Sequence, residues 1–131
     1  MYDISELSQY QAVALQSKVS SSTPHSLIAM LLDGILEKLA IASGAMQRGD
    51  LSMQGSAISS GIRIIDGLRA SLDYNNGGEL ASNLGAMYDY MERRLAEANL
   101  NSDTKIIAEV VSLVTQIKSG WDAIPVKLRG A

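Results

Sequence analysis

Apolar residues recur every three or four positions along most of this chain, which is the spacing of one face of an α-helix. The clearest run is 77–100, GGELASNLGAMYDYMERRLAEANL, which opens with two glycines and contains no proline. At about 100° per residue, its main apolar set shares one face that is expected to pack into a core. That set is Leu80, Leu84, Tyr88, Met91, Leu95 and Ala98. A second, half-apolar stripe, about 80° around the same helix, consists of Asn83, Met87, Tyr90 and Arg94.

The same periodicity predicts three further helices. Thr23-Pro24 is a helix start, because Thr is a good N-cap and Pro fits the first helical position. That helix is expected to reach about residue 47, and Arg48-Gly49-Asp50 is read as a tight connection to a second helix over about 51–73. The last helix is expected to begin at a cap at Ser102 or Asp103 and to run to about residue 123, since Pro125 prevents further extension.

Four helices of about 21 to 24 residues with short links favour antiparallel neighbours, so the predicted fold is all-α, an up-down four-helix bundle. A short helical or extended N-terminal segment is expected to pack on it, hinged at a run of serines, since so short a piece is marginal alone. The predicted divisions are 1–22 for this lid and joint, 23–124 for the bundle and 125–131 for a flexible tail. Glycines inside the helices fit either close packing or a pliant bundle; they are Gly34, Gly44, Gly55, Gly61, Gly67 and Gly85.

Composition narrows the class of protein. The chain has 131 residues, 47% hydrophobic, with a net charge of −3, so it can bury a core but lacks the basic face of a nucleic-acid binder. It has no cysteine, which suits a reducing cytoplasm. No secretory signal pattern and no apolar run of about 20 residues is seen, so neither a leader nor a membrane span is expected.

A search for reactive groups yields no candidate. The single histidine, His25, lies in the first turn of the first helix and is expected at the surface or as a cap. A di-iron bundle would need Glu-x-x-His motifs on two helices, and none occurs. Asp33 and Asp66 interrupt apolar runs but are expected to face outward. We therefore expect no metal, no cofactor and no enzymatic activity.

The predicted helices carry more apolar width than one bundle seam requires, notably the second and fourth. Irregular packing or a homodimer could bury this excess. Alternatively, it forms a groove for an amphipathic helix of another protein, with methionines as adaptable contacts. Trp121, near the end of the last helix, is expected to be a buried plug at one end of the bundle.

Several strings resemble one family. They are STPHSLI at 22–28, Met30-Leu31, Asp33-Gly34, Gly49-Asp50, IRIIDGLRASLD at 62–73 and the 77–100 run. Over about residues 10–124 the chain resembles the flagellin-specific export chaperones, the FliS family, departing from the family pattern at Ser26 and Leu32. The resemblance implies a cytoplasmic bundle that binds the disordered C-terminal segment of flagellin, prevents premature polymerisation and assists delivery to the type III export gate.

The resemblance also gives Tyr10 a role, because it resembles a family tyrosine in a segment that can fold over the client site. The expected partner-binding residues are Ile4, Leu7, Tyr10, Leu27, Leu31, Ile64, Asn83, Met87, Tyr90 and Arg94. The expected partners are flagellin and a component of the export gate, with no nucleic acid and no membrane insertion, and the chain is expected to be a monomer or weak dimer. The alternative is a structural or regulatory bundle that homodimerises through its excess apolar surface.

Overall fold

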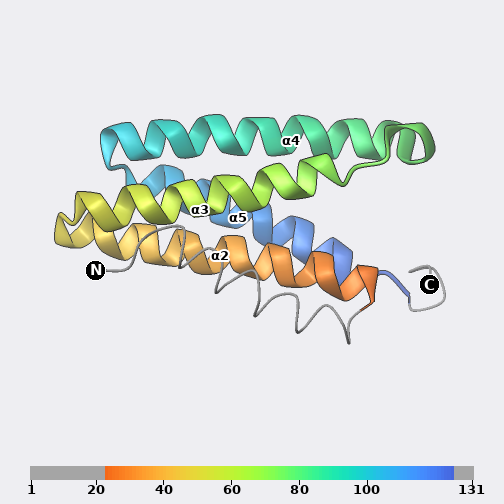
Figure 1. The fold of residues 1–131 in the computed structure, drawn as a ribbon, viewed down its shortest axis with the longest axis horizontal. Helices are drawn as coiled ribbons and strands as arrows, with labels where there is room; N and C mark the ends of the chain where they lie inside the picture. Colours follow the sequence, from red (N-terminus) through yellow and green to blue (C-terminus); the bar gives the residue numbers. More distant parts are fainter. Residues whose placement is uncertain (1–22, 126–131) are drawn as a thin grey trace.

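The computed structural model describes residues 23–125, which form four α-helices (Figure 1). These are α2 (Pro24–Arg48), α3 (Leu51–Ala70), α4 (Tyr74–Asn101) and α5 (Thr104–Asp122). The predictions made for residues 1–22 and 126–131, including those for Ile4, Leu7 and Tyr10, lie outside the described residues. Among the described helices, none is long and apolar enough to cross a membrane.

The helices run alternately up and down, as Figure 1 shows along its long axis. α2 packs against α3 and α5, and α4 packs against the same two helices, so the four surround one shared core. This confirms the predicted antiparallel up-down four-helix bundle.

The core is made by the inward stripes of the four helices. On α2 the fully buried Leu32, Ile35 and Leu39 are followed by the buried alanines Ala42 and Ala45, and the core is close-packed around them. Of the apolar set predicted for 77–100, Tyr88, Met91, Leu95 and Ala98 are buried. Leu80 is 68% exposed, so the prediction that it lies in the core is wrong, whereas Leu84 is half-buried and packs against the core. The first turns of α4 border a cavity, described below, in place of packed side chains.

Short polar residues begin the helices as their types predict. The Thr23 hydroxyl accepts a hydrogen bond of 3.1 Å from the Ser26 amide, and Pro24 follows it as the first helical residue. Asp50 caps α3, reached through a left-handed Gly49 at φ 73°. Of the two candidate caps for the last helix, Asp103 is the one used, since its carboxylate accepts from the amide of Lys105 at 2.9 Å.

The link between α3 and α4 differs from the prediction. α3 ends at Ala70, three residues before the expected end at 73, and helical structure resumes at Tyr74 and not at 77. Asp73 caps a single turn, and Gly78 then interrupts the helix with φ 53° and ψ −126° before α4 continues. A residue with a Cβ rarely adopts this positive φ, which explains the glycine at position 78. The break at Gly78 therefore lies inside the span of α4, whereas the sequence predicted a helix that begins at the glycines.

The interior glycines have two different surroundings. A Cβ built on Gly34 would lie 3.4 Å from Ile64 Cδ1, and one on Gly61 would lie 3.8 Å from Lys38 Cβ, so both sit where α2 and α3 approach closely. A Cβ on Gly55 or Gly67 would meet nothing within 4 Å. Close packing therefore accounts for Gly34 and Gly61 and does not account for Gly55 and Gly67.

A buried amide joins the two helix pairs at the end of the bundle where α3 begins and α4 ends. The Gln54 side chain is 1% exposed. Its Nε2 donates to Asn99 O and to Asn99 Oδ1, both at 3.0 Å, and its Oε1 accepts from Ser102 Oγ at 3.2 Å. All its polar groups are thus satisfied inside the protein, which such a burial demands.

Candidate functional site

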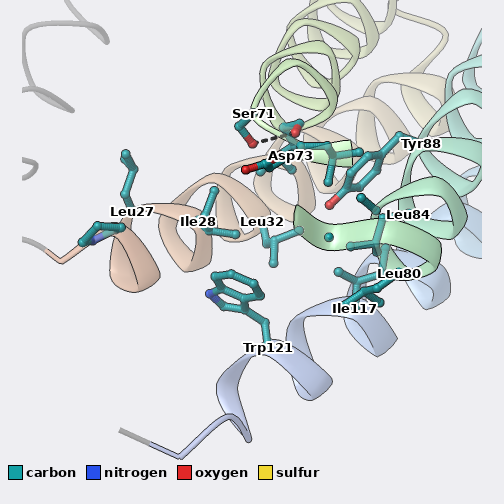
Figure 2. Close-up of a pocket in the computed structure, with 15 residues that line it drawn as sticks. Leu27, Ile28, Leu32, Ser71, Asp73, Leu80, Leu84, Tyr88, Ile117 and Trp121 are labelled. Carbon is teal, nitrogen blue, oxygen red and sulfur yellow. Dashed lines mark hydrogen bonds between the residues drawn. The ribbon is translucent and has the colours of Figure 1, made fainter. Parts of the chain in front are cut away.

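The opposite end of the bundle is hollowed. A cavity of about 440 Å³ opens where α2 begins, α3 ends, α4 begins and α5 ends (Figure 2). All four helices and the α3–α4 link contribute to its lining, and we call it the end pocket. Its lining residues are Pro24, Leu27, Ile28, Leu32, Leu68, Ser71, Leu72, Asp73, Gly77, Leu80, Ala81, Leu84, Tyr88, Ile117 and Trp121.

Helical spacing explains why these residues meet. Leu80, Leu84 and Tyr88 are four residues apart on α4, so they stand in one column along the pocket wall. Ile117 and Trp121 have the same spacing on α5 and face them from the other side (Figure 2). Leu80, the residue of this column nearest the start of α4, remains 68% exposed, which leaves an apolar edge open to solvent.

The pocket contains little that could react. Burial raises the pKa of the Tyr88 hydroxyl, so that group stays neutral. The Asp73 carboxylate is occupied as a cap, accepting from the Asn75 and Asn76 amides at 3.1 Å, and hydrogen bonds from Asn76 hold its pKa below the ordinary value. Between residues 23 and 125, no cluster of histidine and acidic side chains could hold a metal ion. The chemistry offered is the burial of apolar groups.

His25 closes the pocket end of the α2–α5 interface. Its ring stacks on the indole of Trp121 with centroids 4.8 Å apart and planes 8° apart. Its Nε2 lies 2.8 Å from Trp121 O, and Trp121 Nε1 donates to His25 O, also at 2.8 Å. His25 is 7% exposed, so the expectation of a surface residue is wrong. The partner that buries it lies 96 residues away along the chain.

Trp121 is half-buried and forms a wall of the pocket, whereas the sequence suggested a buried plug. One face of the indole covers His25, and the residue also lines the cavity (Figure 2). The last turn of α5 is further fixed by Lys118, whose ammonium lies 3.1 Å from Asp122 Oδ2 and 3.4 Å from Asp33 Oδ1. Asp33 is exposed, as predicted.

The structure separates the predicted partner-binding residues. Among those it describes, Leu27 is the one that lines the end pocket. Leu31 and Ile64 are half-buried, packed against the core beside the other apolar side chains of α2 and α3. Asn83 is exposed and Met87 half-buried, and neither lines the pocket.

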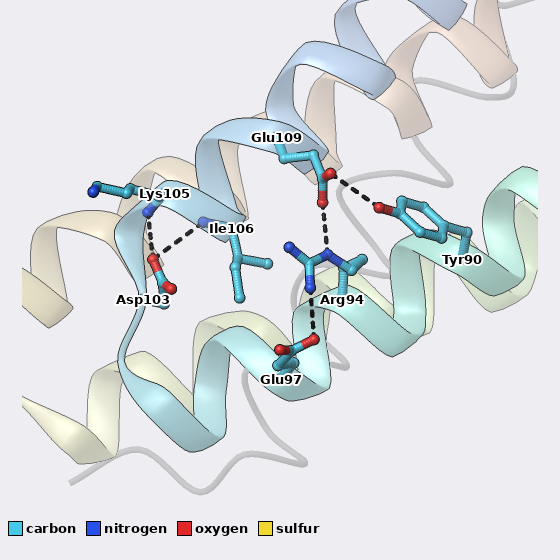
Figure 3. A network of polar contacts seen from close by, with 7 residues as sticks. All are labelled: Tyr90, Arg94, Glu97, Asp103, Lys105, Ile106 and Glu109. Atoms are coloured by element: carbon cyan, nitrogen blue, oxygen red, sulfur yellow. Dashed lines mark hydrogen bonds and ion pairs between the residues drawn. The ribbon is translucent and has the colours of Figure 1, made fainter.

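Tyr90 and Arg94 belong to a polar network between α4 and α5 (Figure 3). Tyr90 donates to Glu109 Oε2 at 2.9 Å, and Arg94 Nε donates to Glu109 Oε1 at 2.7 Å. Arg94 also reaches Glu97 at 2.6 Å. Hydrogen bonds from Arg94 and then Tyr90 lower the pKa of Glu109, and the bond to Glu109 raises that of Tyr90. This stripe shares no residue with the end pocket.

A second charged cluster lies between α3 and α4. Arg69 contacts Asp66 at 2.5 Å, Glu92 at 3.1 Å and Asp89. The Glu92 side chain is 17% exposed, and its Oε2 makes no hydrogen bond within the described part of the chain, although it lies close to the Arg69 charge. Burial, followed by the neighbouring Asp66 carboxyl group, raises the pKa of Glu92 to about 7.

Sequence reasoning missed most of the pocket. Ile28, Leu68, Leu72 and Ile117 belong to the apolar positions that recur every three or four residues in their segments, and this periodicity does not mark them as cavity residues. The sequence signal that could have indicated a cavity was the position of these residues along their helices. They lie within about two turns of helix ends, where a neighbouring helix can stop short and leave an apolar stripe uncovered.

The fold and the pocket together define a class of protein: a four-helix bundle with an apolar binding pocket at one end. Comparison with known proteins is more specific. A family model described as "Flagellar protein FliS" matches residues 6–128. The chain is 48% identical to flagellar secretion chaperone FliSB of Pseudomonas aeruginosa, covering 95% of this chain and 98% of that protein. It is 44% identical to flagellar secretion chaperone FliS of Salmonella typhimurium, covering 97% and 95%.

More distant relatives agree. Flagellar secretion chaperone FliS of Bacillus subtilis is 37% identical over 81% of this chain and 78% of that protein. The chain therefore belongs to the FliS family of flagellar secretion chaperones, a family of chaperones and not of enzymes.

Proposed function

We propose that this protein binds the disordered C-terminal segment of flagellin in the bacterial cytoplasm, prevents its premature polymerisation and assists its delivery to the type III export apparatus. Support comes from membership of the FliS family and from relatives named as flagellar secretion chaperones. The client and the export component are part of the proposal.

The observation that carries the proposal is the end pocket with its exposed apolar edge. A cavity of about 440 Å³ accommodates several aliphatic side chains, and Leu80 presents an uncovered apolar surface beside it. An amphipathic segment of the client would place its apolar anchors in the pocket and cover Leu80, the mode in which a helix lies in a hydrophobic groove. Flagellin segments that pack in a filament carry such apolar faces.

Ordering a disordered client costs conformational entropy, so the contact must be long and apolar. We therefore extend the proposed contact surface beyond the pocket to the residues predicted from the sequence, including Leu31, Ile64 and the α4 stripe with Met87. We propose that Ile4, Leu7 and Tyr10 cover part of this protein's client-binding surface before flagellin binds. A large negative heat-capacity change on binding is the expected signature.

The test is a calorimetric titration of the full chain with a peptide from the C-terminal end of flagellin, at several temperatures. Leu80→Ser should weaken binding by about tenfold or more, equivalent to about 1.4 kcal/mol. Leu100→Ser is the matched control, because Leu100 is an exposed leucine (84%) at the opposite end of the same helix. Equal losses in the two variants, or no binding by the wild type, would reject the pocket as the client site.

The competing function, a bundle that homodimerises through its excess apolar surface, is tested by the same samples. We expect a monomer or weak dimer alone and a 1:1 complex with flagellin, measured by light scattering after size exclusion. A stable dimer that flagellin does not dissociate and does not bind would favour the alternative. Direct binding of the complex to purified export-gate components would test delivery.

A further inference from the structure

The α3–α4 link forms one side of the end pocket. We call residues Asp73–Gly78 the strap; Asp73 and Gly77 line the cavity, as does Leu80, two residues after the strap. The strap is a single turn, closed by a 2.7 Å hydrogen bond from the Gly77 amide to Asp73 O and ended by the positive φ of Gly78. Every residue from 73 to 80 is exposed, so burial of its own side chains does little to hold this turn in place.

What holds the strap is a close fit against α4. A Cβ built on Gly85 would lie 2.6 Å from the Tyr74 hydroxyl oxygen, 3.5 Å from Tyr74 Cζ and 3.6 Å from Leu72 Cδ1. The absent side chain of Gly85 is therefore the space that the tip of Tyr74 occupies. Gly85 is buried although Tyr74 is 51% exposed, so the tyrosine reaches across the surface and covers the glycine with its tip.

A second contact of the same kind lies nearer the break. A Cβ on Gly77 would lie 2.9 Å from Ala81 Cβ, a distance that real side chains essentially never show. The strap thus lies against α4 at two glycines, one in the strap and one in the helix. Regular helix is interrupted on both sides of this turn, at the Ser71–Leu72 link and at Gly78.

We propose that Tyr74, docked on Gly85, is a latch that holds the strap as a wall of the end pocket and so sets the affinity of the pocket for apolar client side chains. The affinity part of this inference rests on the proposed function, whereas the latch itself does not. When Tyr74 leaves Gly85, the strap turns about Gly78 and the pocket loses the wall made by Asp73 and Gly77. Tyr74 and Gly85 are positioning residues, acting through the strap.

The atoms involved give a test by rescue. Gly85→Ala places a methyl group 2.6 Å from the Tyr74 oxygen, so the hydroxyl end of the ring must move away from Gly85. Tyr74→Phe removes that oxygen, and the nearest remaining atom is then Cζ at 3.5 Å, an ordinary van der Waals distance. The double variant Gly85→Ala, Tyr74→Phe should therefore restore the docked strap. Gly67→Ala is the control for alanine in a helix, because nothing lies within 4 Å of a Cβ there.

Two measurements test the latch and its effect on client binding separately. Without client, hydrogen exchange of the Gly77 amide should be about tenfold faster in Gly85→Ala than in the wild type, since local opening releases its bond to Asp73. With the flagellin peptide, the same variant should bind about tenfold more weakly. Tyr74→Phe, Gly67→Ala and the double variant should resemble the wild type in both measurements.

Each contrary result has a distinct meaning. Wild-type exchange in Gly85→Ala, or a double variant as fast as Gly85→Ala, overturns the latch. The expected exchange pattern with equal peptide affinity in all variants overturns the claim that the strap sets affinity. If the wild type binds no peptide, the proposed function fails, while the exchange pattern still decides whether the latch exists. Circular dichroism of each variant verifies that the four helices are intact.

Discussion

His25 and Trp121 hold each other by a reciprocal pair of hydrogen bonds. Trp121 Nε1 donates to His25 O, and His25 Nε2 lies 2.8 Å from Trp121 O. Because a carbonyl can only accept, Nε2 must carry the proton in this arrangement. Two bonds and a parallel ring stack thus join the first turn of α2 to the last turn of α5, at the wall of the end pocket.

Replacing His25 should loosen this end of the bundle. In His25→Ala we expect a loss of about 1–3 kcal/mol in the free energy of unfolding, because Trp121 loses its stacking partner and its carbonyl loses a donor. The Trp121 emission should also shift to longer wavelength as water reaches the indole. Urea unfolding followed by fluorescence measures both. The stability of His25→Phe, which keeps a ring but no donor, should lie between those of the wild type and His25→Ala. A His25→Ala protein as stable as the wild type would show that the His25–Trp121 pair does not contribute to stability.

Glu92 should make stability fall between weakly acidic and neutral pH. Its folded pKa of about 7 exceeds the ordinary 4.5, so the folded protein binds this proton more tightly than the unfolded chain does. The contribution of Glu92 to the free energy of unfolding is most favourable below pH 4.5 and falls as the pH rises to about 7. Above that pH the contribution no longer changes. Glu92→Gln removes the titration.

Relative to the wild type, Glu92→Gln should therefore gain about 1 kcal/mol or more in unfolding free energy between pH 5 and pH 8. Urea unfolding at four pH values measures this difference. Glu37→Gln, a change of an exposed glutamate that forms no ion pair within residues 23–125, is the control for the loss of a carboxylate. Parallel curves for wild type and Glu92→Gln would mean that Glu92 titrates alike in both states.

Leu95 and Leu84 should respond differently to truncation. Leu95 is 0% exposed, so Leu95→Ala should cost about 2–5 kcal/mol of stability. Leu84 is half-buried beside the end pocket, so Leu84→Ala should cost less and should weaken client binding. Thermal unfolding and peptide titration measured together distinguish them. If Leu84→Ala destabilises as much as Leu95→Ala without affecting the client, then Leu84 is an ordinary core residue.

Tyr90→Ala tests whether the α4 stripe contacts the client. Its hydrogen bond to Glu109 is at the surface, and Glu109 keeps Arg94, so the stability loss should be about 1 kcal/mol or less. Flagellin affinity should nevertheless fall, measured by calorimetry. Tyr90→Phe keeps the ring and should keep most of the affinity. Normal binding by Tyr90→Ala would remove Tyr90 from the proposed surface.

The sequence predicts the fold well because helix starts and inward faces are local properties. Thr23, Asp50 and Asp103 each mark a helix start, and apolar periodicity finds the faces that carry Leu32, Leu39 and Leu95. Periodicity shows which way a residue points, but not whether a neighbouring helix extends far enough to cover it. Leu80 therefore looked like a core residue and is exposed.

The pocket was harder to predict because it depends on contacts between distant segments. The burial of His25 requires Trp121, and the place of Tyr74 requires a missing side chain at Gly85. Helix geometry puts Asn83, Met87, Tyr90 and Arg94 on one face of α4, and this shared face is the basis of the predicted stripe. Tyr90 and Arg94 on that face bond to Glu109 of α5, a partner that no pattern within α4 reveals.

The Gln54 hydrogen bonds have a mechanical consequence. Separating the helix pairs at that end would strip a buried amide of three hydrogen-bond partners, which has a cost in free energy. At the other end the helices line a cavity, and the His25–Trp121 hydrogen bonds and ring stack join α2 to α5 beside it. The two helix pairs are therefore joined at both ends of the bundle, α3 to α4 through Gln54 and α2 to α5 through the His25–Trp121 pair, so neither end opens without breaking these hydrogen bonds.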